Sequence, residues 1–217
     1  NTKSWLKGVD QANSQIIDLF EKNTLNLIFY EDSFAKSAFF INTMSKWSAP
    51  IFYFDFDLLY SGYVKSGLIP THKNITLLSP NSDNLHENLK SVIAKISKIK
   101  SLVVIDSLNG FFNILENKKD LGRLINSFIM LLTSSAKNGK SIMLVGSMSK
   151  LNDENDWVFS NTGKHVIDND HMTKIQLTES ADIIIGKILN PDNSKTATSI
   201  EINSTNLEWV ETPIKIC

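Results

Sequence analysis

The stretch that most constrains the fold of this chain runs from Leu25 to Phe40. It opens with an apolar run over residues 25–30, which is typical of a buried β-strand. A polar turn of Glu31, Asp32 and Ser33 follows, and a helix-compatible run begins directly after it. A short buried strand that turns at once into a helix predicts one unit of an α/β sheet.

The same alternation of strands and helices continues along the chain. It predicts an α/β fold with a mainly parallel central sheet, helices on both faces and a C-terminal β extension of antiparallel hairpins. We expect a single domain over residues 1–217, with a helical lead-in over 1–24 and C-terminal strands over 172–217. The expected strands cover residues 25–30, 51–57, 75–78, 101–106, 142–145, 172–177, 182–189, 196–202 and 207–210. The expected helices cover about 34–47, 85–99 and 121–132. We also expect a hairpin or helix near 60–70 and a polar loop over 149–161.

Composition narrows the class of protein. The 217 residues carry a net charge of −1 and Arg123 is the only arginine, which argues against a uniformly basic nucleic-acid binder. Cys217 is the only cysteine, so disulfide frameworks and cysteine-based metal sites are excluded, and the four histidines lack metal-ligand spacing. No apolar run approaches the roughly 18 residues of a membrane span. We therefore expect a cytoplasmic protein without a membrane partner.

The turn after the first strand lies on the frame of a phosphate-binding P-loop, G-x-x-x-x-G-K-[ST]. Laid on that frame, residues 30–37 keep Lys36 and Ser37, but Tyr30 and Ala35 replace the two glycines. Asp106 ends another apolar strand, where a Walker B aspartate would hold the Mg²⁺ of a bound nucleotide; the alternative is an aspartate that caps the following helix. Ser37 and Asp106 are thus the candidate magnesium ligands.

Further motifs follow in a characteristic order. They are FEKNT at 20–24, FDFD at 54–57, VIDS at 104–107, VGSM at 145–148 and GKHVIDNDHMTKIQL at 163–177. In order and spacing these segments resemble the ATPase core of the RecA/RadA recombinase superfamily, most of all its archaeal RadB-type paralogs. The resemblance implies a RecA-like fold, places Asp57 at the position of the water-activating glutamate, and places Ser147 on the strand end that senses the γ-phosphate.

Departures from the family pattern concern the nucleotide site. P-loop glycines let backbone N–H groups point inward in conformations that cost other residues roughly 1–2 kcal/mol each. Glu31 and Asp32 bring carboxylates toward the phosphate positions, each repulsion being on the order of 4 kcal/mol at 4 Å and an effective dielectric constant near 20. Met148 also replaces the family's glutamine. We therefore expect Lys36 to neutralise Glu31, Asp32 or Asp57, and expect no ATP or Mg²⁺ cofactor unless this degenerate site still works.

The segment from Lys150 to Lys164 corresponds to the family's second DNA-binding loop. Trp157 and Phe159 are its candidates for base stacking or for docking against the domain or a partner. Its three acidic residues, 153, 154 and 156, weaken direct DNA binding. Aromatic residues expected in or near loops and strand ends (Phe34, Trp157, Phe159, Trp209) favour a homodimer or association with a RecA-like paralog. The lysines at 90, 95, 98 and 100 are typical of a solvated helix face.

Together these features predict an accessory factor in homologous recombination and DNA repair. Its expected partners are a RecA/RadA-type recombinase or a RecA-like paralog, with single-stranded DNA bound weakly. The alternatives are a regulatory scaffold akin to the KaiC and archaellum ATPases, without a DNA role, and a weak but genuine DNA-dependent ATPase. In that last case Lys36, Ser37, Asp106 and Ser147 would bind the nucleotide and Asp57 would position water.

Overall fold

The computed structural model describes residues 16–70, 72–115, 120–154, 156–159, 171–180, 183–190 and 195–203. The strand expected at 207–210, the residues Lys164 and Trp209, and the start of the helical lead-in lie outside these ranges. Residues 16–22 are helical, as expected for the end of that lead-in.

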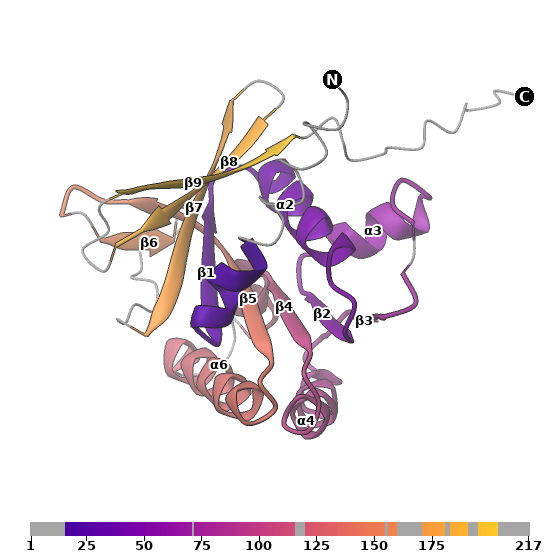
Figure 1. Cartoon of the computed structure of the whole chain (residues 1–217). Helices are drawn as coiled ribbons and strands as arrows, with labels where there is room; N and C mark the ends of the chain where they lie inside the picture. Colours follow the sequence, from indigo (N-terminus) through magenta and orange to yellow (C-terminus); the bar gives the residue numbers. More distant parts are fainter. Residues whose placement is uncertain are drawn as a thin grey trace, which may run out of the picture.

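The strands form one sheet whose central part is parallel. Neighbouring strands follow the order β3-β2-β4-β5-β1-β7-β8-β9, and β6 pairs with β5 outside this path. The strands from β3 to β7 in this order run parallel to their neighbours, whereas β8 and β9 add as antiparallel strands at the β7 edge (Figure 1). The bounds are β1 Leu25–Tyr30, β2 Ile51–Asp55, β3 Ile75–Leu78, β4 Leu102–Asp106, β5 Ile142–Leu151, β6 Trp157–Phe159, β7 Met172–Ser180, β8 Ile183–Leu189 and β9 Lys195–Asn203.

Helices cover both faces of this sheet. α2 and α3 lie on one face, and α4 and α6 lie side by side on the other (Figure 1). Their bounds are α2 Ser33–Ser45, α3 Leu59–Lys65, α4 Leu85–Ile96, α5 Leu108–Ile114 and α6 Leu121–Asn138. The predicted α/β architecture, with a mainly parallel sheet and a C-terminal β extension, is therefore confirmed. Within the described residues, no helix is long and apolar enough to cross a membrane.

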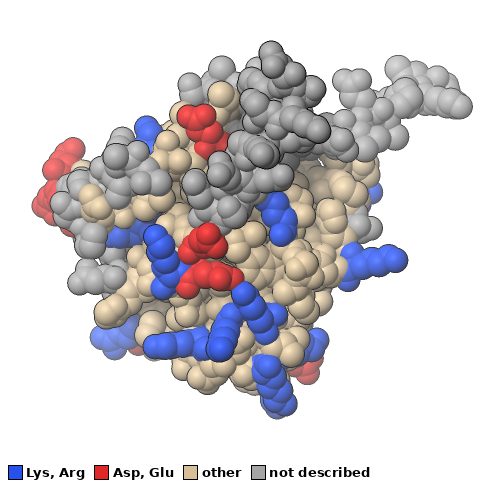
Figure 2. All heavy atoms as spheres, viewed as in Figure 1, with Lys and Arg blue, Asp and Glu red and all other residues tan. Residues whose placement is uncertain are grey.

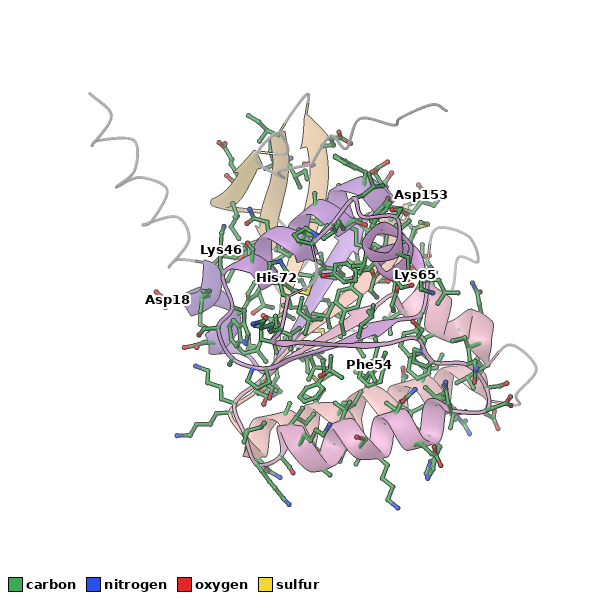
Figure 3. All side chains as sticks on the ribbon, turned by 90° about the vertical axis from the view of Figure 1, so that its right-hand side faces the viewer. Asp18, Lys46, Phe54, Lys65, His72 and Asp153 are labelled. Carbon is green, nitrogen blue, oxygen red and sulfur yellow. The ribbon has the colours of Figure 1, made fainter. Side chains whose placement is uncertain are left out.

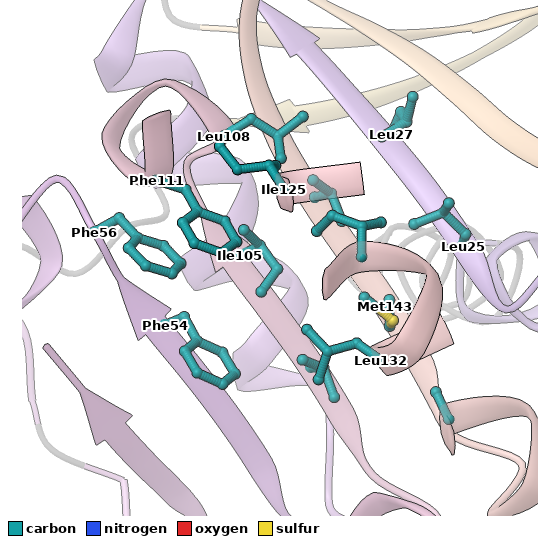
Figure 4. Packing of buried hydrophobic residues seen from close by; sticks show 14 of the residues in the cluster. Leu25, Leu27, Phe54, Phe56, Ile105, Leu108, Phe111, Ile125, Leu132 and Met143 are labelled. Carbon is teal, nitrogen blue, oxygen red and sulfur yellow. The ribbon is translucent and has the colours of Figure 1, made fainter. Parts of the chain in front are cut away.

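The alternation of side chains along β2 shows how the sheet divides the core. Phe52 and Phe54 pack with α4, α5 and α6 on one face, where Phe56 beyond the strand joins them (Figure 4). Tyr53 points to the opposite face and packs with α2 and α3. Because side chains on a strand alternate between faces, Asp55 shares the face of Tyr53. The side chain of Asp55 is thereby directed toward the face that α2 covers.

The prediction of a loop over 149–161 is wrong in part, because residues 149–151 and 157–159 form a β-hairpin. β5 continues to Leu151, and β6 pairs with it antiparallel, with Ser149 opposite Phe159. Trp157 is 3% exposed and stacks on Phe29 with ring centroids 4.0 Å apart, and Phe159 packs edge-on against Phe112. Burial of these rings against the core stabilises the hairpin. Of the uses predicted for these two rings, docking against the domain is the one that the structure shows, and they do not form an exposed aromatic surface.

Candidate functional site

The carboxyl ends of the parallel strands bring several of the predicted site residues together. Asp106 ends β4, Tyr30 ends β1, and Asp57 follows β2. Lys36 belongs to the second turn of α2, which packs on this face of the sheet. In open α/β sheets this end of the strands carries the ligand site.

Lys36 makes the central contacts of the site. Its side chain is 1% exposed. The Nζ atom forms an ion pair with Asp106 Oδ1 and donates a hydrogen bond to Asp57 Oδ2 over 3.2 Å. It also lies 5.3 Å from the centroid of the Tyr30 ring, which is cation–π distance. One buried ammonium group therefore serves two carboxylates and one aromatic face.

Asp106 is held from both sides. Its Oδ1 contacts Lys36, and its Oδ2 accepts a hydrogen bond from the Tyr53 hydroxyl. Burial raises the pKa of Asp106 to about 6, although the Lys36 ammonium and the Tyr53 hydroxyl oppose this shift. For Lys36, burial alone would lower the pKa, but the Asp106 carboxylate and its neighbours outweigh it and hold the pKa above the ordinary value. The lysine stays charged at neutral pH.

The two buried tyrosines of the site remain neutral. Burial raises the pKa of Tyr30 to about 12 against the opposing effect of Lys36. Burial and the neighbouring Asp106 carboxylate raise the pKa of Tyr53 well above its usual value. Both phenols are thus proton donors, and neither supplies an anion for the lysine. The carboxylates are what balance its charge.

The start of α2 is occupied by a side chain of the protein itself. Asp32 is the N-cap, and its Oδ1 accepts hydrogen bonds from the N–H groups of Phe34 at 2.7 Å and Ala35 at 3.0 Å. Aspartate is a preferred N-cap because its carboxylate accepts from N–H groups that lack a partner in the helix. The expectation that Lys36 neutralises Glu31 or Asp32 is thus replaced: Lys36 pairs with Asp57, as one alternative predicted, and with Asp106.

The connection from β1 to α2 is also shorter than a P-loop. β1 ends at Tyr30 and α2 begins at Ser33, so Glu31 and Asp32 alone join them. Lys36 therefore lies inside a helix whose first turn is already formed, with its backbone N–H donating to Asp32 O over 3.3 Å. A phosphate-wrapping loop needs several N–H groups that converge on one point outside the helix. This connection leaves no residues to form it.

The predicted hydroxyl ligands have partners inside the protein. Ser37 Oγ donates to Ser33 O over 2.9 Å, within the same helix. Ser147 is fully buried, and its Oγ lies 2.6 Å from Ser149 Oγ on the same strand. Among the described residues, no group of three or more His, Cys, Asp or Glu side chains is placed to hold a metal ion. As arranged, these residues do not fit a magnesium-bound nucleotide.

Tyr53 and Asp55 also belong to the site, although no motif in the sequence indicated them. Tyr53 binds Asp106, and Asp55 Oδ2 accepts from the backbone N–H of Ser61 at 2.6 Å, which anchors α3. The register places Asp55 directly beside Asp106. Strand alternation was the available signal, because it puts residues 53 and 55 on the face that α2 covers.

Gly110 is the residue that allows the loop after β2 to approach α5. A Cβ atom at this position would lie 2.2 Å from Asp57 Oδ1 and 2.9 Å from the carbonyl carbon of Phe56. Phe56 and Asp57 both donate backbone N–H groups to Asp106 O, at 2.7 and 3.2 Å. The glycine therefore leaves room for Asp57 at the place where Lys36 reaches it.

The predicted DNA or partner loop does not form one surface. Lys150 is exposed on β5, whereas Trp157 and Phe159 are buried in the hairpin core. Phe34, the other predicted contact aromatic in the described residues, is half-buried at the start of α2. Lys164 lies outside the described residues. Base stacking by the two aromatic residues would require the hairpin to open.

Comparison with known proteins gives a likeness in structure. No known protein-family model matches the chain, and no curated protein sequence matches it. Among solved structures, the chain is similar to the crystal structure of the RadB recombinase, with a TM-score of 0.55 and 13% sequence identity. The match covers 84% of this chain and 88% of that one. At this identity the comparison establishes the fold, which is RecA-like.

Proposed function

We propose that this protein is a RecA-fold recombinase paralog that acts as an accessory factor in homologous recombination and DNA repair without using ATP. It would assist a RecA/RadA-type recombinase, or another RecA-like paralog, through protein contacts. The observation that carries the proposal is the buried Lys36, which lies between Asp57 and Asp106 where a nucleotide-binding protein would keep it free for phosphate. The likeness to the RadB recombinase supports the choice of family.

The energy of the lysine contacts supports the loss of nucleotide binding. At 3.2 Å and an effective dielectric constant near 20, the contact of Lys36 with Asp57 is worth about 5 kcal/mol of gross Coulomb energy. The contact with Asp106 is more buried. A micromolar ligand provides about 8 kcal/mol in total. Because ATP would have to replace both contacts and displace the Asp32 cap, its net binding free energy would be smaller than that of a ligand entering a site with a free lysine.

One alternative retains support from the geometry. Lys36, Asp57 and Asp106 do converge at the strand ends, as they would in a weak DNA-dependent ATPase. In that reading Lys36 swings from the carboxylates to phosphate when ATP enters. This second candidate predicts that ATP changes the behaviour of the protein, whereas the proposed function predicts that it does not.

The test is association with the strand-exchange protein of the same cell. Pull-down and analytical ultracentrifugation, each with and without ATP and Mg²⁺, should give a complex of equal affinity in both conditions. A complex that forms only with ATP would favour the ATPase. Absence of the complex, together with a blank gel shift on single-stranded DNA at low salt, would contradict the recombination reading and favour a scaffold without a DNA role.

A further inference from the structure

A second candidate site lies at the opposite end of the sheet. A cavity of about 350 Å³ opens where β1, β4 and β5 begin, and it is lined by Glu21, Asn23, Thr24, Lys100, Lys137 and Lys140 among others. The Lys36 cluster sits at the carboxyl ends of these strands. Figure 3 shows the two ends from the side, with Asp18 and Lys46 at the amino end and Lys65 and Asp153 at the other.

The cavity carries a concentration of positive charge that the whole chain does not have. Its three lysines and one glutamate give a local net charge of +2, against −1 for the chain. The segments 95–100 and 137–140 together contain five lysines and no acidic residue. Figure 2 shows the molecule in the same view as Figure 1. Lys or Arg side chains gather there over the region of α4 and α6, beside a small group of Asp or Glu side chains.

Compensation of the helix dipoles accounts for only some of these lysines. Lys95 and Lys137 lie in the last turns of α4 and α6, where a positive charge is favourable. Lys98, Lys100 and Lys140 lie beyond the helix ends. Lys100 contacts Glu21 over 2.6 Å, which orients its ammonium group at the rim of the cavity.

The two lysine segments are fixed relative to each other by a buried serine. Ser141 is 3% exposed, donates to the carbonyls of Ile96 and Ile99 at 3.2 and 3.0 Å, and accepts from the backbone N–H of Ser101 at 2.9 Å. Gly139 permits this approach, because a Cβ there would lie 1.9 Å from Ile96 O. The charges therefore stand on a rigid base, as a preformed binding site requires.

Lys140 holds an unusual backbone conformation. Its φ of 53° lies in the left-handed region, which favours glycine. α6 ends in a Schellman motif, which normally has glycine at the position of Lys140. Its two backbone hydrogen bonds run from Lys140 N to Lys137 O and from Ser141 N to Ala136 O. Lys140 thus stands at a place where glycine would be more stable. Such an outlier beside a cavity supports the hypothesis of a function for this side chain.

We propose that this cavity and its lysines bind the phosphate groups of single-stranded nucleic acid. Lysine ammonium groups act as point charges on phosphate and read no base sequence. The lysine segments extend past the cavity to Lys95 and Lys98, so they suit successive phosphates of a chain. The lysines of the cavity predict a ligand with several phosphate groups. That this ligand is single-stranded nucleic acid rests on the proposed function. It places nucleic-acid contact at the amino end of the sheet, away from the hairpin at 149–159.

The test is fluorescence anisotropy with a mixed-sequence single-stranded DNA, titrated from 50 to 200 mM salt. For Lys137 and Lys140, the two cavity lysines outside the ion pair with Glu21, log K against log salt should have a slope of about −1.4, since each phosphate contact on a single strand contributes about −0.7. The double variant Lys137→Ala/Lys140→Gly should reduce this slope by about 1.4 and lower the affinity on the order of tenfold at 50 mM salt. Lys65→Ala, at the opposite end of the sheet, is the matched control and should change neither.

Folding is controlled by Lys140→Gly alone. It should raise the melting temperature by roughly 2–5 °C, because it relieves the left-handed strain, and should still weaken DNA binding. Unchanged DNA binding in the double variant, or none by the wild type at 50 mM salt, would overturn the site. So would competition by inorganic phosphate or a mononucleotide as strong as that of the oligonucleotide, which would indicate a small phosphate ligand. Recombinase pull-down is unaffected by these failures and tests the proposed function separately.

Discussion

Replacing Lys36 with methionine separates a structural lysine from a phosphate-binding one. Methionine keeps the length and the apolar stem but removes the charge, so Asp106 and Asp57 lose their shared partner. Removing one member of a buried ion pair typically costs 3–5 kcal/mol. The contact with Asp57 alone has a gross Coulomb energy of about 5 kcal/mol at 3.2 Å and an effective dielectric constant near 20. We expect Lys36→Met to lower the free energy of unfolding by about 3–5 kcal/mol at pH 7.

The loss should depend on pH in a defined direction. Without the ammonium group, the pKa of the buried Asp106 rises further above its ordinary value, so the folded state takes up a proton that the unfolded state does not need. Between about pH 4 and 6 the ionisation of Asp106 lowers the stability of both proteins equally, so the deficit of the variant grows only above about pH 6, by up to about 1.4 kcal/mol per pH unit. Urea unfolding at pH 4.5, 6 and 7.5 measures this.

A double-mutant cycle and a surface control complete the experiment. Lys36→Met combined with Asp106→Asn should lose less than the two single changes added together, with a coupling of about 2–3 kcal/mol. Lys65→Met, at the exposed end of α3, should stay within about 0.5 kcal/mol of wild type. A loss below 1 kcal/mol for Lys36→Met at pH 7, with no coupling to Asp106, would refute the structural role of the lysine.

Three further predictions follow from neighbouring contacts. Asp32→Ala should cost about 0.5–2 kcal/mol in urea unfolding through loss of the N-cap, while Asp32→Asn retains most of it. Gly110→Ala should cost more than about 2 kcal/mol, because its Cβ would lie 2.2 Å from a carboxylate oxygen, whereas Gly122→Ala, with nothing within 4 Å, should be tolerated in a thermal melt. Because the pKa of Asp106 is raised to about 6 in the folded protein, the protonated carboxyl favours folding below about pH 4, and this stabilisation is lost as pH rises through 6. The loss in free energy of unfolding between pH 4 and 8 should be about 3 kcal/mol, and Asp106→Asn should abolish it.

The sheet could be predicted where a buried run is bounded by turn residues. The strands 25–30 and 75–78 lie where periodicity placed them, as β1 and β3. β6 was missed because three residues are too short to show alternation. α5 was predicted only as the alternative in which Asp106 caps a following helix, and the cap is Ser107 instead. Gly110, unfavourable in a helix by propensity, is required there by its close approach to Asp57. Such a requirement arises from tertiary packing and has no local sequence signal.

The candidate site could be predicted in its members and only partly in their pairing. Lys36, Asp57 and Asp106 follow from the P-loop frame and the strand ends. The pairing of Lys36 with Asp106 depends on how far α2 lies over β4, which the sequence does not encode locally. The bond from Tyr53 to Asp106 depends on the register that sets Tyr53 beside Val104. The N-cap role of Asp32 had a local signal, an aspartate directly before a helix, but its charge was interpreted as repulsion toward phosphate.

The central proposal is that Lys36 binds Asp57 and Asp106 of the protein itself and no nucleotide. Calorimetry tests it most directly. The wild-type protein is titrated at pH 7 with ATP and Mg²⁺, and the titration is repeated with Ser37→Ala, which removes a hydroxyl bonded within α2. We predict no saturable heat up to about 1 mM ATP, a binding free energy weaker than about 4 kcal/mol, in both proteins. Stoichiometric binding with a low-micromolar Kd that Ser37→Ala weakens would contradict the account.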